Sequence, residues 1–228
     1  MSVRYDEVIG LLREAYDGGA EQRDAATKSA WKLAEREAFL GWLKGHGCRR
    51  LLEVGAGTGQ DSAYFQENGL DVVAVDLSPA MVALCREKGV EAHAMDFLSL
   101  DFEPGSFDAV YALNCLLHVP DGDLPSGAGR DPHGDAARWA VLSRCVRWGG
   151  GLTGESTFEQ DDHYPPRFFS FRDDERLQEY ARECFEIVDF HVVGTHGWRF
   201  QSLTLRRPAS SPDLDQRAGG AGARRIRP

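Results

Sequence analysis

Residues 51–61 read Leu-Leu-Glu-Val-Gly-Ala-Gly-Thr-Gly-Gln-Asp, a short apolar run that ends in a glycine-rich turn. The apolar run predicts a buried strand, and the residues after Gly59 predict a helix. A strand that enters a helix through such a turn leaves backbone N–H groups and the positive end of the helix dipole beside any bound ligand. The glycines alone are a weak signal, because many tight turns need glycine for a positive φ.

Three further apolar runs follow, with predicted helices between them. The runs cover residues 71–76, 90–96 and 107–113, and the helices cover 60–69 and 79–88. Ser78 suits the N-cap of the second helix, and Pro79 suits its first position. Strands that alternate with helices of this length predict right-handed βαβ units and a parallel sheet.

The two ends of the chain complete the expected architecture. Apolar residues at helical spacing predict a helical N-terminal cap over residues 1–47. A helix over 173–183 precedes two strands, 185–193 and 200–206, which a short turn can join only in an antiparallel pair. Residues 208–228 are mainly Ser, Pro, Gly, Ala and Arg, so we expect a disordered tail there.

These elements predict an α/β fold, a Rossmann-like three-layer sandwich. Its sheet is expected to be mostly parallel and seven-stranded, with an antiparallel last strand. The ligand-binding domain is expected over residues 48–207, between the cap and the tail.

Acidic residues stand at the ends of three successive predicted strands. Because the carboxyl ends of parallel strands meet at one edge of a sheet, we expect these side chains to lie close together. Glu53 before the turn and Asp61 after it suit a ligand that carries an ammonium group. Asp76 suits the hydroxyls of a ribose, Asp96 suits an exocyclic amine, and Phe97 offers a ring face to a base. Together these features describe S-adenosylmethionine.

Residues 49–119 resemble the class I S-adenosylmethionine-dependent methyltransferases, of the small-molecule group called type 11 or 25. The motifs that carry the resemblance are E-V-G-A-G-T-G at 53–59, V-D-L-S-P-A-M at 75–81, M-D-F at 95–97 and F-D-A-V-Y-A-L-N at 107–114. The resemblance implies that residues matching Glu53, Gly55 and Gly57 hold the methionine part of the cofactor. It assigns Asp76 to the ribose and the Asp96–Phe97 pair to the adenine.

The resemblance also implies a wider site and a function. The expected cofactor-binding residues are Glu53, Gly55, Ala56, Gly57, Gly59, Asp76, Leu77, Met81, Asp96, Phe97, Asn114 and Leu116. His118 is the candidate general base, with packing or loop capping as the alternative. Tyr5, Tyr16 and Trp31 are expected to line the acceptor side, although Trp31 and Trp42 also suit the core. The implied activity is methyl transfer to a small molecule.

The amino-acid composition limits the binding partners and the cellular compartment that we expect for this protein. The net charge of −10 argues against a nucleic-acid partner, and no apolar stretch is long enough to span a membrane. The five scattered cysteines predict neither a disulfide framework nor a zinc site, which favours the cytoplasm. Asp161-Asp162-His163-Tyr164 is expected to be a loop, and no metal site is expected. The acceptor, its reacting atom and the oligomeric state stay open.

Residues 126–150 depart from the family pattern. The family continues here with an amphipathic helix, a glycine turn and an apolar fifth strand, and reading back-translated codons one base later restores all three. We infer compensating frameshifts near Leu124–Ser126 and near Gly151–Glu155, which the coding DNA can test; the alternative is a genuine family variant. After such a shift, the fifth strand position must be filled by something like Trp139–Val146.

Two other functions remain as alternatives. The first is a methyltransferase-like protein that binds the cofactor but is catalytically inert, which binding of S-adenosylhomocysteine without turnover would indicate. The second is a nicotinamide-dependent oxidoreductase. Gln60 stands where that fold requires glycine, and Glu53 would repel a pyrophosphate, so the sequence disfavours it.

Overall fold

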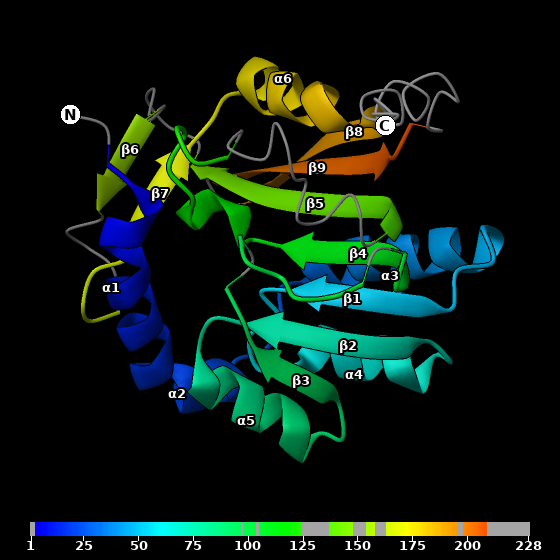
Figure 1. Cartoon of the computed structure of the whole chain (residues 1–228), viewed down its shortest axis with the longest axis horizontal. Coiled ribbons are helices and arrows are strands. Elements are labelled where there is room, and N and C mark those ends of the chain that lie inside the picture. Colours follow the sequence, from blue (N-terminus) through cyan, green and yellow to red (C-terminus); the bar gives the residue numbers. More distant parts are fainter. Residues whose placement is uncertain are drawn as a thin grey trace, which may run out of the picture.

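The centre of the molecule is a sheet with the strand order β3-β2-β1-β4-β5-β9-β8 (Figure 1). Its strands are β1 (Arg50–Val54), β2 (Asp71–Asp76), β3 (Glu91–Ala94), β4 (Phe107–Leu113), β5 (Ala137–Arg147), β8 (Glu186–Thr195) and β9 (Trp198–Arg206). Neighbouring strands from β3 to β5 are parallel, whereas β9 is antiparallel to both β5 and β8. The predicted α/β class and parallel core are confirmed.

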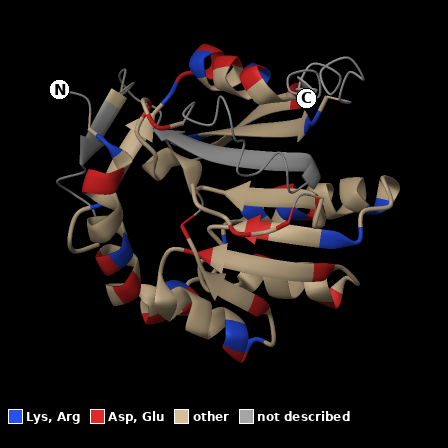
Figure 2. Cartoon of the chain, in the orientation of Figure 1, with Lys and Arg blue, Asp and Glu red and all other residues tan. Residues whose placement is uncertain are grey.

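This computed structural model describes residues 3–96, 98–103, 105–124, 137–147, 154–157, 163–195 and 198–208. The expected tail lies outside the described residues, apart from Pro208. Among the helices in the described ranges, none has the length and apolar character needed to cross a membrane. Both signs of charge occur along α1 and α6 (Figure 2).

Helices cover both faces of the sheet. They are α3 (Ala30–Gly45), α4 (Gln60–Glu67), α5 (Pro79–Glu87) and α6 (Asp174–Cys184). Side chains alternate along a strand, so Leu51 packs with Phe39 and Phe65 on one face, while Leu52 packs with Leu177 on the other. Full burial of each such side chain contributes about 1.5–3 kcal/mol, which ties the helices to the sheet.

The predicted N-terminal cap divides into two parts. The helices α1 (Tyr5–Gly18) and α2 (Ala20–Ala25) lie across the carboxyl ends of the parallel strands (Figure 1). In contrast, α3 belongs to the sandwich, because Phe39, Leu40 and Leu43 are buried against the sheet. Of the expected cap, α1 and α2 are therefore the parts that cover the edge where the acidic residues were expected.

The fifth position of the sheet is occupied by β5. Its residues pair in parallel with β4 and antiparallel with β9. The backbone of β5 includes Trp139–Val146, the residues that the frameshift hypothesis places here. Residues 126–136 and 148–150 lie outside the described residues, so the frameshift itself stays a prediction.

A short segment after β4 is held by a buried arginine. This segment, η1 (Leu116–His118), lies near a two-stranded sheet of β6 (Gly154–Thr157) and β7 (Phe168–Phe171) that sequence reasoning did not predict. The Arg172 side chain is buried and donates through Nη2 to the Val119 carbonyl at 2.6 Å. It also pairs with the Asp121 carboxylate. These contacts fix the loop that carries His118.

Candidate active site

Two adjoining cavities lie at the carboxyl ends of the parallel strands. The first, which we call the apolar cavity, has a volume of about 630 Å³, and the second, the polar cavity, about 800 Å³. Arg23, Gly55, Gly57, Leu113 and Asn114 line both. The glycine turn therefore stands between the two cavities.

The turn is built by close packing and by bonds to β2. A Cβ atom on Gly55 would lie 2.5 Å from the Cys115 Cβ, and one on Gly59 would lie 2.8 Å from the Cys85 Sγ. On Gly57, whose φ is +57°, the nearest atom to such a Cβ would be the Arg23 Nε at 4.0 Å. Only Gly57 therefore leaves open space on its Cα, and that space lies where the cavities meet.

The backbone N–H groups of the turn bind the protein itself. Those of Gly55 and Ala56 donate to the Val75 carbonyl at 2.9 and 3.1 Å, and that of Gly57 donates to Asp76. These three groups were expected to lie free beside a ligand. The structure instead uses them to hold the end of β2, so the turn brings backbone close to the cavities rather than offering these donors.

This difference between the glycines predicts two separate effects of substitution. Gly59→Ala is expected to destabilise the fold by about 3 kcal/mol, because the new methyl group overlaps Cys85 at a positive φ. Gly57→Ala is expected to cost only about 1 kcal/mol of strain but to block ligand binding. Urea unfolding and calorimetric titration with S-adenosylhomocysteine measure the two effects. Equal loss of stability in both variants would contradict this prediction.

Glu53 is a buried carboxyl group at the end of β1. It is 3% exposed, lines the polar cavity and accepts a hydrogen bond from the Ser62 hydroxyl. Burial, followed by repulsion from Asp61, raises the pKa of Glu53 from 4.5 to about 8. The carboxyl group is therefore mostly protonated at neutral pH, and a cation placed beside it would favour its ionised form.

Asp61 has a different role from the one expected. Its buried carboxylate pairs with Lys28 and with the Arg36 Nη1 at 3.1 Å. The two cations already neutralise Asp61, so Glu53 is the better partner for a ligand ammonium.

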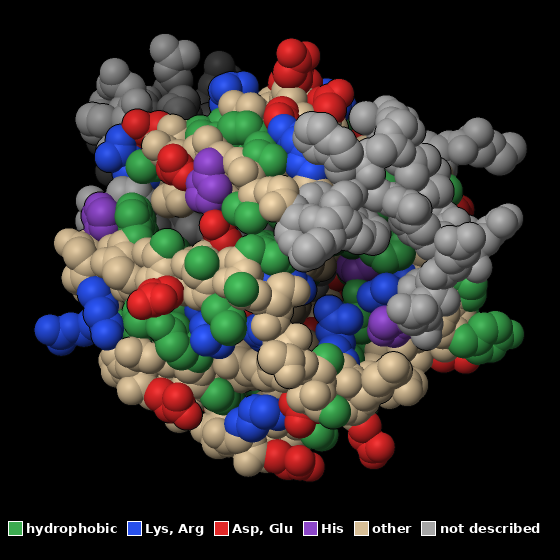
Figure 3. Space-filling view, turned by 180° about the vertical axis from the view of Figure 1, so that it is seen from behind, with side chains coloured by type: hydrophobic (Ala, Val, Ile, Leu, Met, Phe, Trp, Pro, Cys, Tyr) green, Lys and Arg blue, Asp and Glu red, His purple; other side chains and the backbone are tan. Residues whose placement is uncertain are grey.

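Lys, Arg and His side chains gather around a hollow on the back of the molecule (Figure 3).

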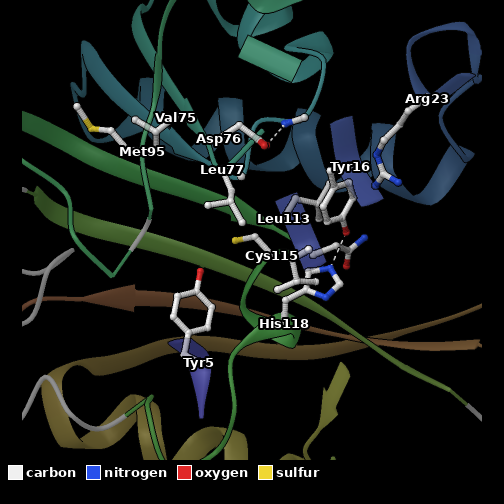
Figure 4. Close-up of a pocket in the computed structure, with 14 residues that line it drawn as sticks. Tyr5, Tyr16, Arg23, Val75, Asp76, Leu77, Met95, Leu113, Cys115 and His118 are labelled. Carbon is white, nitrogen blue, oxygen red and sulfur yellow. Dashed lines mark hydrogen bonds between the residues drawn. The ribbon is translucent and has the colours of Figure 1, made fainter. Parts of the chain in front are cut away.

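Asp76 ends β2 with its carboxylate at the apolar cavity (Figure 4). Its Oδ2 accepts from the Gly57 N–H at 2.8 Å, and its Oδ1 accepts from the Ser78 N–H at 2.9 Å. Burial raises the pKa of Asp76 to about 6, although these two bonds favour the ionised form. Each carboxylate oxygen has two lone pairs, so both can accept a further hydrogen bond.

Asp96 follows β3 and contacts α1. Its Oδ1 accepts from the Tyr5 hydroxyl and from the Leu98 N–H, both at 3.0 Å. The Tyr5 backbone N–H also donates to the Asp123 Oδ2 at 2.7 Å. The start of α1 is thereby held over the strand ends. Phe97 lies outside the described residues.

Part of the chain is similar in sequence to known proteins. The sequence profile described as "Methyltransferase domain" matches residues 51–129. Human glycine N-methyltransferase is 34% identical over 125 residues, covering 47% of this chain and 40% of that protein. Over residues 51–129 the chain is therefore similar to methyltransferase domains.

Solved structures share the fold of this chain. Burkholderia thailandensis 1,6-didemethyltoxoflavin-N1-methyltransferase, crystallised with S-adenosylhomocysteine, has a TM-score of 0.68 and 24% identity over 91% of each chain. Magnesium protoporphyrin IX methyltransferase of Synechocystis PCC 6803 has a TM-score of 0.63 and 16% identity, covering 87% of this chain and 96% of that one. The sequence match to human glycine N-methyltransferase covers less than half of either protein.

The fold brings most of the predicted residues to the cavities. Those that line one or both are Glu53, Gly55, Ala56, Gly57, Asp76, Leu77, Asn114 and His118, together with the expected acceptor-side residues Tyr5 and Tyr16. Trp31 instead lies against Phe200, with ring centroids 3.8 Å apart, and is partly buried.

Four other predicted cofactor residues in the described part of the chain are not among the residues that line the cavities. Gly59 is the N-cap of α4, and Met81 is fully buried in α5. The Leu116 carbonyl accepts from Arg172, and Asp96 is bonded to Tyr5. The assignments of these residues to the cofactor stay predictions.

Several residues that line the cavities were not predicted from the sequence. Arg23, Lys28 and Lys32 line the polar cavity, and the spacing of Lys28, Lys32 and Arg36 was the only signal that could have shown a basic stripe. Asn114 was expected at the site, but its backbone conformation and its unpaired side-chain oxygen were not. It has a φ of +58°, and its buried Oδ1 has no hydrogen-bond partner among the described residues.

The described residues of the chain contain no candidate metal centre. There, no group of three or more His, Cys, Asp and Glu side chains could hold an ion. His163 packs against the Tyr16 ring, with centroids 5.7 Å apart, while Asp161 and Asp162 lie outside the described residues.

Proposed function

We propose that the chain transfers a methyl group from S-adenosylmethionine to a small-molecule acceptor. The observation that carries this proposal is the pair of cavities that meet at Gly57, one polar beside Glu53 and one apolar beside Asp76. A nucleoside joined to an amino acid has the same division into a charged end and a ring-bearing end. The family match supports the same activity.

Each end of the cofactor has suitable partners. Glu53 would face the ammonium group, and the cations of the polar cavity, Arg23 and Lys32 among them, would face the carboxylate. Asp76 would accept the ribose hydroxyls, and Asp96 with Phe97 would hold the adenine. Leu77 and Met95 supply apolar surface between these groups.

The chain's own part in catalysis is to bind, orient and exclude water. The bound cofactor supplies an electrophilic methyl group on a positively charged sulfur. Helices α1 and α2 cover the strand ends and limit the access of solvent. We assign the Asn114 Oδ1 to the reacting region, because it is a buried acceptor at the junction of the cavities.

Cofactor binding is expected to release a proton from Glu53. In the empty protein burial keeps this carboxyl group largely protonated below pH 8, and a ligand ammonium favours its ionised form. At pH 7, binding of S-adenosylhomocysteine should therefore release roughly one proton, and affinity should rise with pH from 6 to 8. Calorimetric titration in buffers that differ in ionisation enthalpy measures the released protons.

Glu53→Gln is the control for this titration. It retains the size of the side chain and should bind more weakly without releasing the proton. Proton release that is the same in Glu53→Gln and in the wild-type protein would exclude Glu53 as the source.

Turnover is tested by transfer of a labelled methyl group from S-adenosylmethionine to a panel of small hydroxyl, amine and thiol compounds. Label on any of them supports the proposed activity. Tight binding of S-adenosylhomocysteine without transfer to any compound would instead favour the catalytically inert alternative.

A further inference from the structure

The apolar cavity contains a hydrogen-bonded pair, Tyr16 and His118, whose proton positions follow from their surroundings. The His118 Nδ1 lies 2.7 Å from the Phe168 carbonyl oxygen, which can only accept, so Nδ1 carries the hydrogen. In a neutral imidazole the Nε2 atom is then the acceptor. The Tyr16 hydroxyl, 2.6 Å away, therefore donates to Nε2 (Figure 4).

With its proton directed at His118, the Tyr16 oxygen can only accept further hydrogen bonds. It already accepts one from the Arg167 Nη1 at 3.2 Å. A phenol oxygen has two lone pairs, and Tyr16 lines the apolar cavity. A molecule that contacts this oxygen from the cavity must therefore bring a hydrogen of its own.

The positive charge of two arginines near Tyr16 favours some of these molecules over others. The guanidinium groups of Arg167 and Arg23 lie 5.3 and 5.5 Å from the centre of the Tyr16 ring. They disfavour an acceptor that arrives as an ammonium ion and stabilise negative charge that develops as an acceptor loses its proton. Leu12 and Leu77 supply apolar surface beside them.

We propose that Tyr16 takes the proton of the acceptor and passes its own proton to His118, so that the acceptor is an uncharged, largely apolar molecule with a reactive O–H or N–H group. This rests on the proposed methyl transfer. As the acceptor atom bonds to the methyl carbon, the carbon–sulfur bond breaks and its electron pair stays on sulfur. The acceptor proton moves to the Tyr16 oxygen, and the Tyr16 proton moves to the His118 Nε2. The positive charge lost at sulfur reappears on the imidazole, which later returns its proton to water.

Two matched probes test the proposal without turnover. Protein saturated with S-adenosylhomocysteine is titrated with 4-nitrophenol, which has a proton to give, and with 4-nitroanisole, which does not. The phenol is expected to bind about tenfold more tightly, as one hydrogen bond to a polarised acceptor allows. At a pH at which free 4-nitrophenol is neutral, the bound form should show the phenolate absorbance band.

Two variants separate the roles of the pair. Tyr16→Phe should retain S-adenosylhomocysteine binding but lose both the phenolate band and the preference for the phenol. His118→Asn can still donate to the Phe168 carbonyl but has no base, so it should bind 4-nitrophenol without the band. Tyr180→Phe, which removes a hydroxyl bonded to the Asp121 carbonyl, is the control and should behave like the wild-type protein.

Equal binding of the two probes, binding of neither, or a phenolate band that persists in Tyr16→Phe would overturn the proposal. Failure of the wild-type protein to bind S-adenosylhomocysteine would count against the proposed function instead, so the two failures are distinct.

Discussion

Asp76→Ala is expected to weaken the binding of S-adenosylhomocysteine about 100-fold. Asp76 ends β2 at the apolar cavity, and each of its oxygens can accept one bond beyond those from Gly57 and Ser78. Two charge-assisted bonds to ribose hydroxyls contribute about 3 kcal/mol together, and every 1.4 kcal/mol corresponds to a factor of about ten. Calorimetric titration at pH 8, above the raised pKa of about 6, measures the loss with the carboxylate ionised.

The opposite end of the same strand supplies the control. Asp71 begins β2 and has an exposed side chain, so Asp71→Ala should retain wild-type affinity. Because the pKa of Asp76 is raised, wild-type affinity should also fall as the pH drops through about 6 and the carboxylate becomes protonated. Affinity that is unchanged in Asp76→Ala, in a protein with wild-type circular dichroism, would remove Asp76 from the site.

Arg172→Met is expected to lower the free energy of unfolding by about 3 kcal/mol. The Arg172 side chain is fully buried, pairs with Asp121 and donates to the Val119 carbonyl. Removing one partner of a buried ion pair costs about 3–5 kcal/mol, and the partial exposure of Asp121 places this case at the lower end. Urea unfolding at 25 °C measures the difference.

Arg176→Met is the matched control for this substitution. Arg176 lies near the start of α6, and its ion pair with Glu179 is exposed, so its loss should leave the free energy of unfolding nearly unchanged. If Arg172→Met were as stable as Arg176→Met, the buried contacts of Arg172 would not hold the η1 loop.

The sequence predicted the elements whose local signals agree with their packing. Ser78 accepts from the Met81 N–H at 3.1 Å as the predicted N-cap, and Pro79 follows it in α5. The packing of α3 against the sheet could not be predicted, because helical spacing shows that a helix has an apolar face but not what that face packs against. The β6–β7 pair was missed, since Phe168–Phe171 has no alternation of polar and apolar residues.

The candidate site was predictable where a residue's role follows from its place at a strand end. Glu53 and Asp76 are two such residues, and both line the cavities. Asp61 was misinterpreted because its partners, Lys28 and Arg36, precede it by many residues and reach it only through the packing of α3. No local pattern could have shown the unpartnered oxygen of Asn114, which depends on the backbone geometry after β4.

The hydrogen bond from the Tyr5 hydroxyl to Asp96 ties the first helix to a carboxylate of the proposed cofactor site. If an adenine amine takes this carboxylate, as we propose, the bond from the Tyr5 hydroxyl is lost while the bond from the Tyr5 backbone N–H to Asp123 remains. Cofactor binding and the loss of this contact are then thermodynamically coupled, so each favours the other.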